Sequence, residues 1–384
     1  MKVLHLTPYF GTQPMFGGIG RFVSRLSTAQ RKLGCEVTVM APASRDDHDG
    51  GELANGVHLV TFTTGLDRLG RLMNLRIAPK SFWALRTVAS GQDVIHVHGT
   101  RTFQSAVLTV FLRSLDSLVV LQPHGTFPYP GGKVRSKLIF DSVFGNKLYA
   151  SAKSWIALTY HESREIQKRG VDASKIRVIP NCIDAPLVIP DISKEEFARR
   201  FDLSHIEAPW LLYLGRLHET KGLGTLLDTF RRVRSEFANA QLLIIGPKDE
   251  SSVIPDLDHS HSSQIGVHWL GTVSESDKFD ALKLVEALVT PSFYGFPTTF
   301  LEAMAIGTPV VTCSGYGLEQ ELKDVVTFAD SPESLGSAIT SLLSDPERIT
   351  RIRLQSRDFV MTRFETRLVA EMHVSLYHSL VTAG

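Results

Sequence analysis

One stretch, residues 287–311, constrains the fold of this chain more than any other part of its sequence. It opens with the apolar run Ala287–Val289, which Pro291 closes. A short apolar run that ends at a proline is typical of a strand buried on both faces, as in a parallel sheet. A loop that contains Gly295 and Pro297 follows. We therefore expect a parallel strand that runs into a loop at its carboxyl end.

The second part of the same stretch predicts a helix and a further strand. Ala303, Met304 and Ala305 favour a helix. Gly307 ends that helix, and Thr308–Val311 starts the strand. In such a unit the helix N-terminus points out of the carboxyl edge of the sheet. Its unpaired N–H groups and partial positive charge suit a phosphate or a sugar hydroxyl.

Glu302, in the first turn of this predicted helix, has two interpretations. Thr299 lies three residues earlier, so the two residues together predict a capping box that only stabilises the helix. Alternatively, the Glu302 carboxylate accepts hydrogen bonds from a diol of a ligand. The spacing by itself favours the capping box.

The whole stretch resembles the signature of the retaining glycosyltransferases of family 4, P-S-x-x-E-G-F-G-x-x-x-L-E-A-M-A-x-G-x-P-V-V. The matching residues are Pro291, Ser292, Gly295, Phe296, Leu301, Glu302, Ala303, Met304, Ala305, Gly307, Pro309, Val310 and Val311. The second of the two signature glutamates is Glu302. The first falls on Tyr294, and the usual second glycine falls on Pro297. In the family the first glutamate lies near the donor sugar, so Tyr294 bears on sugar choice and on activity.

The resemblance implies an α/β fold of the GT-B class, in which two Rossmann-like domains face each other across a cleft. It also implies transfer of a sugar from a nucleotide diphosphate with retention at the anomeric carbon. No cofactor and no essential metal are expected for that reaction. The resemblance extends over almost the whole chain but is dense only in the second half.

The length and composition limit which classes of protein this chain can belong to. A chain of 384 residues is long enough for two domains with separate cores. The formal net charge of +1 gives no global field that would favour a nucleic acid partner. The three cysteines are far apart and odd in number, which is typical of a reducing compartment. The apolar run at the N-terminus is too short for a signal peptide, and no apolar run approaches the length of a membrane span, so we expect a cytoplasmic protein.

The beginning of the chain predicts a Rossmann-like opening. Lys2–Thr7 and Glu36–Met40 are predicted strands, and a helix is expected to follow Gly20. A dinucleotide fingerprint is excluded, because the loop is long and the second strand does not end in an acidic residue. Gly17 and Gly18 form either a flexible turn or a close approach to a ligand phosphate. The family has a glycine-rich loop facing the donor here, so the resemblance favours donor binding.

Two histidines follow predicted strands of the first half. His98 ends the strand that begins at Asp93, and His124 follows the strand Leu118–Gln122. Ligands bind at this edge of an open parallel sheet. We expect His98 to be a hydrogen-bonded core or lining residue. His124 with Gly125 resembles the histidine-glycine element of the family, in which the imidazole bonds a hydroxyl of the donor sugar.

Two cations follow the first predicted strand of the second half. Arg216 and Lys221 lie between the strand Trp210–Leu214 and the start of a helix. They are either solvated charges or a site that neutralises a pyrophosphate leaving group. The resemblance to the Gly-Arg…Lys-Gly motif of the family implies the diphosphate site. It also implies that the nucleotide base packs on the loop at Thr272 and Val273.

We expect an N-terminal acceptor-side domain over residues 1–184 and a linker over 185–205. A nucleotide-sugar domain follows over 206–362, and a C-terminal helix over 363–384 packs back on the first domain. Two basic and aromatic tracts, Leu66–Val88 and Lys133–Lys153, are either solvated helix surfaces or a peripheral contact with anionic membrane.

The function expected from the sequence is a retaining glycosyltransferase that uses a nucleotide sugar and a sugar or lipid-linked glycan acceptor. The alternative is a regulatory or scaffold subunit that binds the nucleotide sugar without transfer. A sugar-nucleotide epimerase is a lesser alternative that lacks a convincing carboxylate pair. The candidate catalytic residues are His124, Arg216, Lys221 and Glu302. The candidate donor-binding residues are Gly17, Gly18, Thr272, Val273, Tyr294, Gly295, Phe296, Pro297, Thr298, Thr299 and Leu301.

Overall fold

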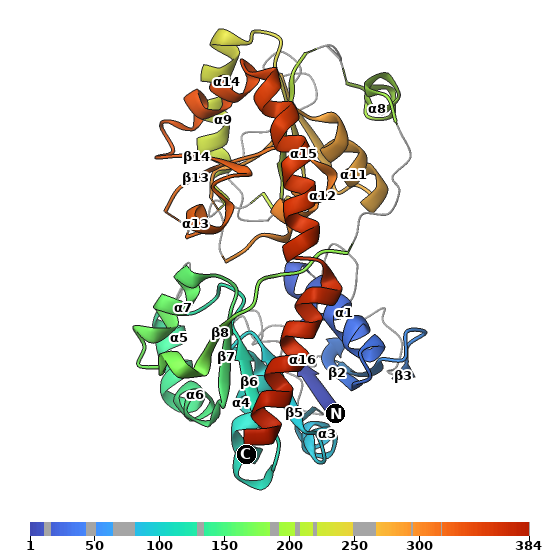
Figure 1. The fold of residues 1–384 in the computed structure, drawn as a ribbon, viewed down its shortest axis with the longest axis vertical. Coiled ribbons are helices and arrows are strands. Elements are labelled where there is room, and N and C mark those ends of the chain that lie inside the picture. Colours follow the sequence, from blue (N-terminus) through green and yellow to red (C-terminus); the bar gives the residue numbers. More distant parts are fainter. Residues whose placement is uncertain are drawn as a thin grey trace. The chain divides into compact units, whose positions relative to one another are not determined.

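The chain forms two units, each with its own parallel sheet (Figure 1). The first contains residues 1–184 and 366–384, and the second contains residues 185–365. The computed structural model describes residues 1–10, 17–43, 51–63, 81–128, 134–184, 192–203, 208–217, 221–248, 266–292, 295–315 and 317–383. Within these residues the predicted α/β fold of two Rossmann-like domains is confirmed.

The sheet of the first unit has the strand order β3-β4-β2-β1-β5-β6-β7-β8. The strands are β1 (Lys2–Leu6), β2 (Glu36–Ala43), β3 (Gly51–Glu52), β4 (His58–Thr63), β5 (Val94–His98), β6 (Leu118–Gln122), β7 (Ser154–Ala157) and β8 (Ile176–Val178). The pairings are parallel except the short antiparallel pair of β3 with β4. The order reverses between β1 and β5, which is the switch point where open sheets of this kind bind ligands.

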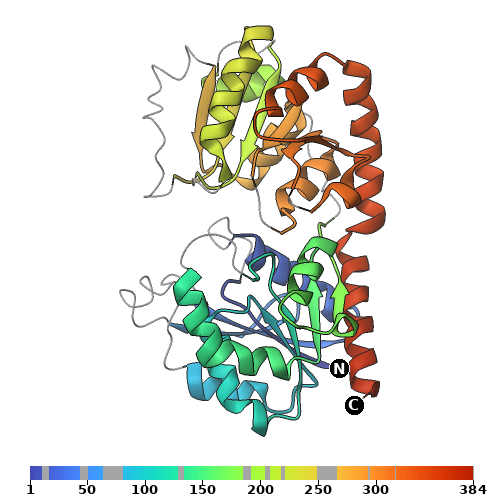
Figure 2. The same cartoon turned by 90° about the vertical axis from the view of Figure 1, so that its left-hand side faces the viewer.

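Helices cover both faces of this sheet (Figure 2). They are α1 (Gly17–Lys32), α3 (Ser81–Ala89), α4 (Phe103–Phe111), α5 (Val134–Phe140), α6 (Asn146–Ser151), α7 (Tyr160–Gln167) and α16 (Thr366–Ala383). The C-terminal helix α16 packs against α1. Val369 and Tyr377 of α16 join Phe22 and Leu26 of α1 in one buried apolar cluster. Burial of these large side chains, at roughly 1.5–3 kcal/mol each, holds the end of the chain on the first unit.

The sheet of the second unit is parallel throughout, with the order β11-β10-β9-β12-β13-β14. Its strands are β9 (Trp210–Leu214), β10 (Gln241–Ile245), β11 (Val267–Gly271), β12 (Ala287–Thr290), β13 (Val310–Cys313) and β14 (Val326–Ala329). Its helices are α8 (Lys194–Arg200), α9 (Leu223–Glu236), α11 (Glu275–Leu284), α12 (Thr298–Ile306), α13 (Glu319–Leu322), α14 (Leu335–Leu343) and α15 (Pro346–Arg363). The order reverses between β9 and β12, so this sheet has a switch point of its own.

Local structure departs from expectation in two places. The predicted linker 185–205 contains helix α8, because Phe197 is buried and packs near Trp210 and Phe201. Helix α1 begins at Gly17 rather than after Gly20, so the glycines form its first turn instead of a preceding loop. At α8, tertiary contacts override the local composition of the segment. At α1, the start of the helix was not recognised from the sequence.

Gly246 follows β10 at a point where the backbone leaves no room for a side chain. Its φ is +147°, and a Cβ atom there would lie 1.9 Å from the carbonyl oxygen of Gly215. We expect Gly246→Ala to lower the free energy of unfolding of the second unit by about 3 kcal/mol or more, measured by denaturant titration. Gly224→Ala is the control, because its Cβ on α9 meets nothing within 4 Å. An equal effect of both substitutions would contradict the steric argument.

Candidate functional site

In the second unit, the loops that follow β9 and β12 contact each other at the carboxyl edge of the sheet. The first loop carries Arg216 and ends at Gly222, where φ is +69°. A Cβ atom on Gly222 would lie 3.0 Å from Cβ of Pro291 and 3.4 Å from Cβ of Ser292. Glycine therefore lets the cationic loop pack closely against the signature stretch. Two motifs far apart in the sequence meet at the switch point.

Arg216 and Lys221 place two positive charges in the first of these loops. Arg216 is exposed and Lys221 is half-buried. Burial lowers the pKa of the Lys221 ammonium, and the nearby charge of Arg216 lowers it further. An anion bound here would relieve the repulsion between the cations and replace lost hydration. The electrostatics of the loop thus favour a phosphate or another anion.

The signature helix α12 begins without the predicted capping box. Pro297 is its N-cap, and no side chain accepts a hydrogen bond there. The predicted box of Thr299 with Glu302 is wrong, because Thr299 is already the second residue of the helix Thr298–Ile306. No side-chain cap therefore occupies the N-terminus of α12. A helix end of this kind can bind an anion.

Glu302 lies in the second turn of α12 and is completely buried. Its Oε1 lies 3.1 Å from Nζ of Lys278, which is itself buried on α11. The same Nζ lies 4.2 Å from the ring centroid of Phe279. A carboxylate removed from water needs a compensating cation, and Lys278 supplies that charge.

Sequence analysis missed Lys278, because a lysine on a helix is usually solvated. The signal that could have revealed it is its place on α11. Lys278, Ala281 and Leu282 are spaced at i, i+3 and i+4, and all three are buried. Lysine therefore occupies a position on the apolar face of this helix.

The predicted base-binding loop lies between β11 and α11. Thr272 is exposed and Val273 is half-buried, and Ser274 then caps α11 by accepting a hydrogen bond from the N–H of Asp277. Helices α11 and α12 pack against each other. The ion pair of Lys278 with Glu302 therefore joins the helix after this loop to the signature helix.

The other predicted donor-binding residues divide by burial. Gly295, Pro297 and Thr299 are half-buried, whereas Phe296, Thr298 and Leu301 are buried. The ring centroid of Phe296 lies 5.2 Å from that of Phe364, so this aromatic side chain packs into the core. Phe296 and Leu301 thus support the loop and helix through packing. Tyr294 lies outside the described residues.

In the first unit, Gly17 and Gly18 lie in the first turn of α1, and Gly18 is exposed. His124 follows β6 with a φ of +56°, which is unusual for a residue with a side chain. Glu162 supports this turn, because its Oε1 accepts a hydrogen bond from the Gly125 N–H at 2.6 Å. Its Oε2 accepts one from the Leu158 N–H at 2.7 Å. Burial raises the pKa of Glu162 to about 7, against the effect of both bonds.

His124 belongs to a group of histidines that pack together inside the first unit. His98 is completely buried, with Nδ1 2.9 Å from Nε2 of His124 and Nε2 2.9 Å from Nδ1 of His5. The expectation that His98 is a hydrogen-bonded core residue is confirmed. His96 and His373 lie beside it, with their ring centroids 5.7 Å apart.

Burial keeps these imidazoles neutral. Loss of hydration lowers the pKa of His5 and of His373 to about 4 and that of His124 to about 3. The same cause, reinforced by the neighbouring histidines, lowers the pKa of His96 and His98 well below the ordinary value. The cluster therefore carries no charge near neutral pH.

Three of these histidines are close enough to be considered as metal ligands. His5, His96 and His98 each offer a ring nitrogen within 4.8 Å of the others. Two nitrogens bound to one zinc ion lie at most about 4.2 Å apart, since each Zn–N bond is about 2.1 Å. His5 and His98 already use both ring nitrogens in hydrogen bonds with protein partners. We interpret the cluster as a hydrogen-bond network.

Comparison with known families matches both halves of the chain. Residues 16–187 match "Glycosyltransferase Family 4", and residues 195–359 match "Glycosyl transferases group 1". The chain belongs to the glycosyltransferases of family 4. Its fold is that of the GT-B class.

Two curated relatives align with this glycosyltransferase over most of their length. A glycogen synthase of Mycobacterium tuberculosis is 25% identical, with 94% of this chain and 91% of the relative covered. A phosphatidyl-myo-inositol mannosyltransferase of Mycobacterium leprae is 25% identical, with 100% and 98% covered.

Two solved structures show the same fold. The sucrose-phosphate synthase of Thermosynechococcus elongatus has a TM-score of 0.80 at 19% identity and covers 100% of both chains. The Anabaena protein Alr3699/HepE in complex with UDP-glucose has a TM-score of 0.74 at 18% identity and covers 99% of this chain and 100% of its own. In the described part of the glycosyltransferase, no helix has the length and apolar character needed to cross a bilayer.

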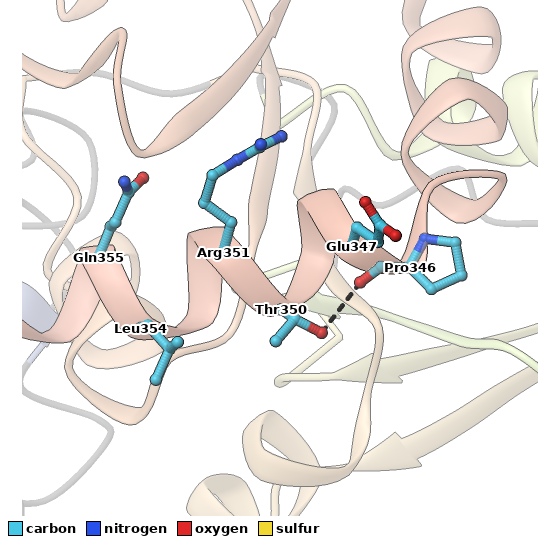
Figure 3. A pocket seen from close by; sticks show the side chains of 6 residues that line it. All are labelled: Pro346, Glu347, Thr350, Arg351, Leu354 and Gln355. Carbon is cyan, nitrogen blue, oxygen red and sulfur yellow. Dashed lines mark hydrogen bonds between the residues drawn. The ribbon is translucent and has the colours of Figure 1, made fainter.

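A surface hollow of about 530 Å³ lies along α15, far in sequence from the candidate residues (Figure 3). Its lining is Pro346, Glu347, Thr350, Arg351, Leu354 and Gln355. All of these side chains come from one helix, and Thr350 Oγ1 donates a hydrogen bond to the Pro346 carbonyl at 3.0 Å. Polar groups from several elements do not converge there, so we assign it no ligand.

The pair of Lys278 with Glu302 predicts a large effect on stability. We expect Lys278→Met to lower the free energy of unfolding by about 3–5 kcal/mol in denaturant titrations, because the carboxylate of Glu302 stays buried without its cation. The combined replacement Lys278→Met with Glu302→Met should recover most of the loss. Lys168→Met is the control, since Lys168 pairs with Glu165 at the surface. A loss as small as that of the control would contradict the assignment.

The neutral histidines predict destabilisation in acid. Their pKa values are lower in the folded state, so the stability they contribute is present above about pH 6.5 and is lost as pH falls towards 4. Each contributes about 2 kcal/mol less at pH 5 than at pH 7. His373→Leu should therefore reduce the difference in unfolding free energy between pH 7 and pH 5 by about 2 kcal/mol. His378→Asn, an exposed position on the same helix, is the control. An unchanged pH dependence in His373→Leu would contradict the argument.

Proposed function

We propose that this family 4 glycosyltransferase moves a sugar from a nucleotide diphosphate to an acceptor hydroxyl, with retention at the anomeric carbon. The observation that carries the proposal is the close approach of Gly222, which ends the loop of Arg216 and Lys221, to Pro291 and Ser292, which lead into the uncapped helix α12. Two cations and a helix N-terminus form a site for a diphosphate. The Anabaena protein of the same fold was solved with UDP and glucose, which supports a nucleotide-sugar donor.

In this proposal the bond between the anomeric carbon and the diphosphate oxygen breaks, and a bond to the acceptor oxygen forms on the same face. The acceptor proton passes to the leaving phosphate. Arg216, Lys221 and the N–H groups of α12 stabilise the charge that develops on that phosphate. The chemistry then needs neither a protein nucleophile nor a cofactor.

The remaining residues position the donor. Glu302 would accept hydrogen bonds from the ribose, with Lys278 compensating its charge beneath the site. Thr272 and Val273 would pack on the base. His124 would bond a hydroxyl of the sugar. The loop from Tyr294 to Thr298 keeps its predicted role in donor binding. Polysaccharide, glycolipid or another glycan is the expected product, as the names of the curated relatives support.

Peripheral contact with an anionic membrane stays a prediction. The tract Leu66–Val88 is described only from residue 81, where Trp83 of α3 is exposed. In the tract Lys133–Lys153, helix α5 exposes Leu138 and Ile139. Exposed apolar side chains in a basic segment are the pattern that such contact requires.

A melting-temperature panel with UDP, GDP, ADP and their sugar conjugates tests the donor site. Binding to the folded state adds about 2.7 kcal/mol of stability at a ligand concentration one hundred times the dissociation constant. A shift with one nucleotide and a larger shift with its sugar conjugate are expected. No shift with any of them would contradict the proposal. Binding of a conjugate without transfer to any acceptor would favour the regulatory or scaffold alternative. In that alternative, Tyr294 replaces the first signature glutamate and the protein has no transfer activity.

The role of Arg216 predicts a specific loss of affinity. Arg216→Ala should weaken binding of the active nucleoside diphosphate by roughly 10-fold to 100-fold, because a charge-assisted hydrogen bond contributes about 1.5–3 kcal/mol. Calorimetric titration measures this, with the melting temperature as a check on folding. Arg231→Ala is the matched control, since Arg231 is exposed on α9 and pairs with Asp228. Unchanged affinity in folded Arg216→Ala would rule out the diphosphate assignment.

A further inference from the structure

A continuous row of hydrogen bonds joins helix α1 to His124 through the core of the first unit. Oε1 of Gln30 lies 2.7 Å from Nε2 of His5. Nδ1 of His5 lies 2.9 Å from Nε2 of His98, and Nδ1 of His98 lies 2.9 Å from Nε2 of His124. In each of the two inner rings, those of His5 and His98, one nitrogen bonds the neighbour on the Gln30 side and the other nitrogen bonds the neighbour on the His124 side. The four side chains therefore form one directed chain.

The direction of this chain follows from the chemistry of its end. A neutral imidazole has one N–H donor and one bare acceptor nitrogen. An amide oxygen can only accept, so His5 must carry its proton on Nε2 and accept at Nδ1. His98 must then donate from Nε2 and accept at Nδ1. His124 in turn donates from Nε2, which leaves its Nδ1 bare.

The side-chain amide of Gln30 makes a second hydrogen bond. Its Nε2 donates to the Tyr377 hydroxyl at 3.4 Å, and that oxygen lies 2.7 Å from Nδ1 of His96. Gln30 is fully buried, as is Tyr377 on α16. Rotation of the amide would turn its NH₂ group towards His5 and reverse every donor in the chain. In the order in which Oε1 accepts from His5, the Tyr377 hydroxyl accepts from the Gln30 NH₂ group and can donate to Nδ1 of His96, so both contacts of the amide are satisfied.

The groups around the chain leave it uncharged. His96 and His373 face it from β5 and α16, and burial lowers the pKa of both imidazoles. The carboxylate of Glu162 lies beside the turn after His124 and accepts backbone N–H bonds from Gly125 and Leu158. Its acceptor atoms are thus used by the backbone. A neutral chain keeps one proton per ring, as the tautomer argument requires.

We propose that Gln30, His5 and His98 are positioning residues that set the tautomer of His124, so that His124 presents a bare Nδ1 to the ligand. No protein partner of His124 Nδ1 is recorded among the described residues. A bare nitrogen accepts a hydrogen bond from a sugar hydroxyl and repels a phosphate oxygen. This inference rests on the proposed function, and it assigns His124 to the sugar rather than to the diphosphate.

The first test needs no variant of the chain. Protein labelled with ¹⁵N at histidine is examined at pH 7.5 by two-bond ¹⁵N–¹H correlation, which distinguishes Nδ1–H from Nε2–H tautomers. The His124 signals are assigned by their absence from His124→Asn. We expect one tautomer of His124, with the proton on Nε2. A proton on Nδ1 would overturn the proposal.

The second test asks whether Gln30 sets the order. In Gln30→Met the acceptor for His5 is lost, so the chain can run in either direction and His124 should show both tautomers. Ser27→Ala is the matched control, because Ser27 is buried on the same helix and bonds only to the Ser24 carbonyl among the described contacts. A single Nε2–H tautomer in folded Gln30→Met would overturn the role of Gln30. If this variant does not fold, the wild-type spectrum still decides the order.

The third test separates this inference from the proposed function. With the nucleotide sugar that gives the largest shift in the panel, Gln30→Met should weaken binding about 5-fold to 10-fold, the effect of one hydrogen bond. Affinity for the bare nucleoside diphosphate should not change. Equal weakening of both ligands would overturn the positioning role. If the wild type binds neither ligand, the proposed function fails, while the tautomer spectrum stands as a separate result.

Discussion

Every candidate residue depends on one constraint: strands of a parallel sheet bring their carboxyl ends to the same edge. In the first unit β5 and β6 deliver His98 and His124 to that edge. In the second unit β9 and β12 deliver Arg216 and the signature stretch. In the second unit the strand order reverses between β9 and β12, so residues separated by many positions in the sequence converge there. The helices serve to hold the sheets in which this convergence occurs.

The candidate residues of the second unit include charged side chains. The charge of Arg216 helps to lower the pKa of the Lys221 ammonium, and an anion bound beside both cations would oppose that effect. Beneath them Glu302 and Lys278 compensate each other in the dry interface of α11 and α12. A buried pair of this kind is weak as a source of stability, but it fixes where a carboxylate points.

The histidine cluster of the first unit is polar but uncharged. Five histidines share its interior, and burial keeps each of them neutral. His5, His98 and His124 bond one another as neutral rings, which avoids the cost of burying ions. In our proposal, the orientation of the Gln30 amide sets, through these bonds, which ring nitrogen of His124 carries the proton.

The sequence by itself determined the strands that precede the candidate residues, the order of the two sheets in the chain and the loops at the carboxyl ends of those strands. It did not indicate β3 and β4. The features that it determined rest on local signals: apolar runs closed by Pro291, glycines such as Gly307, and a motif of fixed spacing. Only the tertiary structure decided that Thr299 does not cap α12 and that Glu302 meets Lys278. It alone joined Gln30 to His124 through rings from different strands. Such partners are set by packing between elements distant in the sequence, and no local pattern of residues encodes that packing.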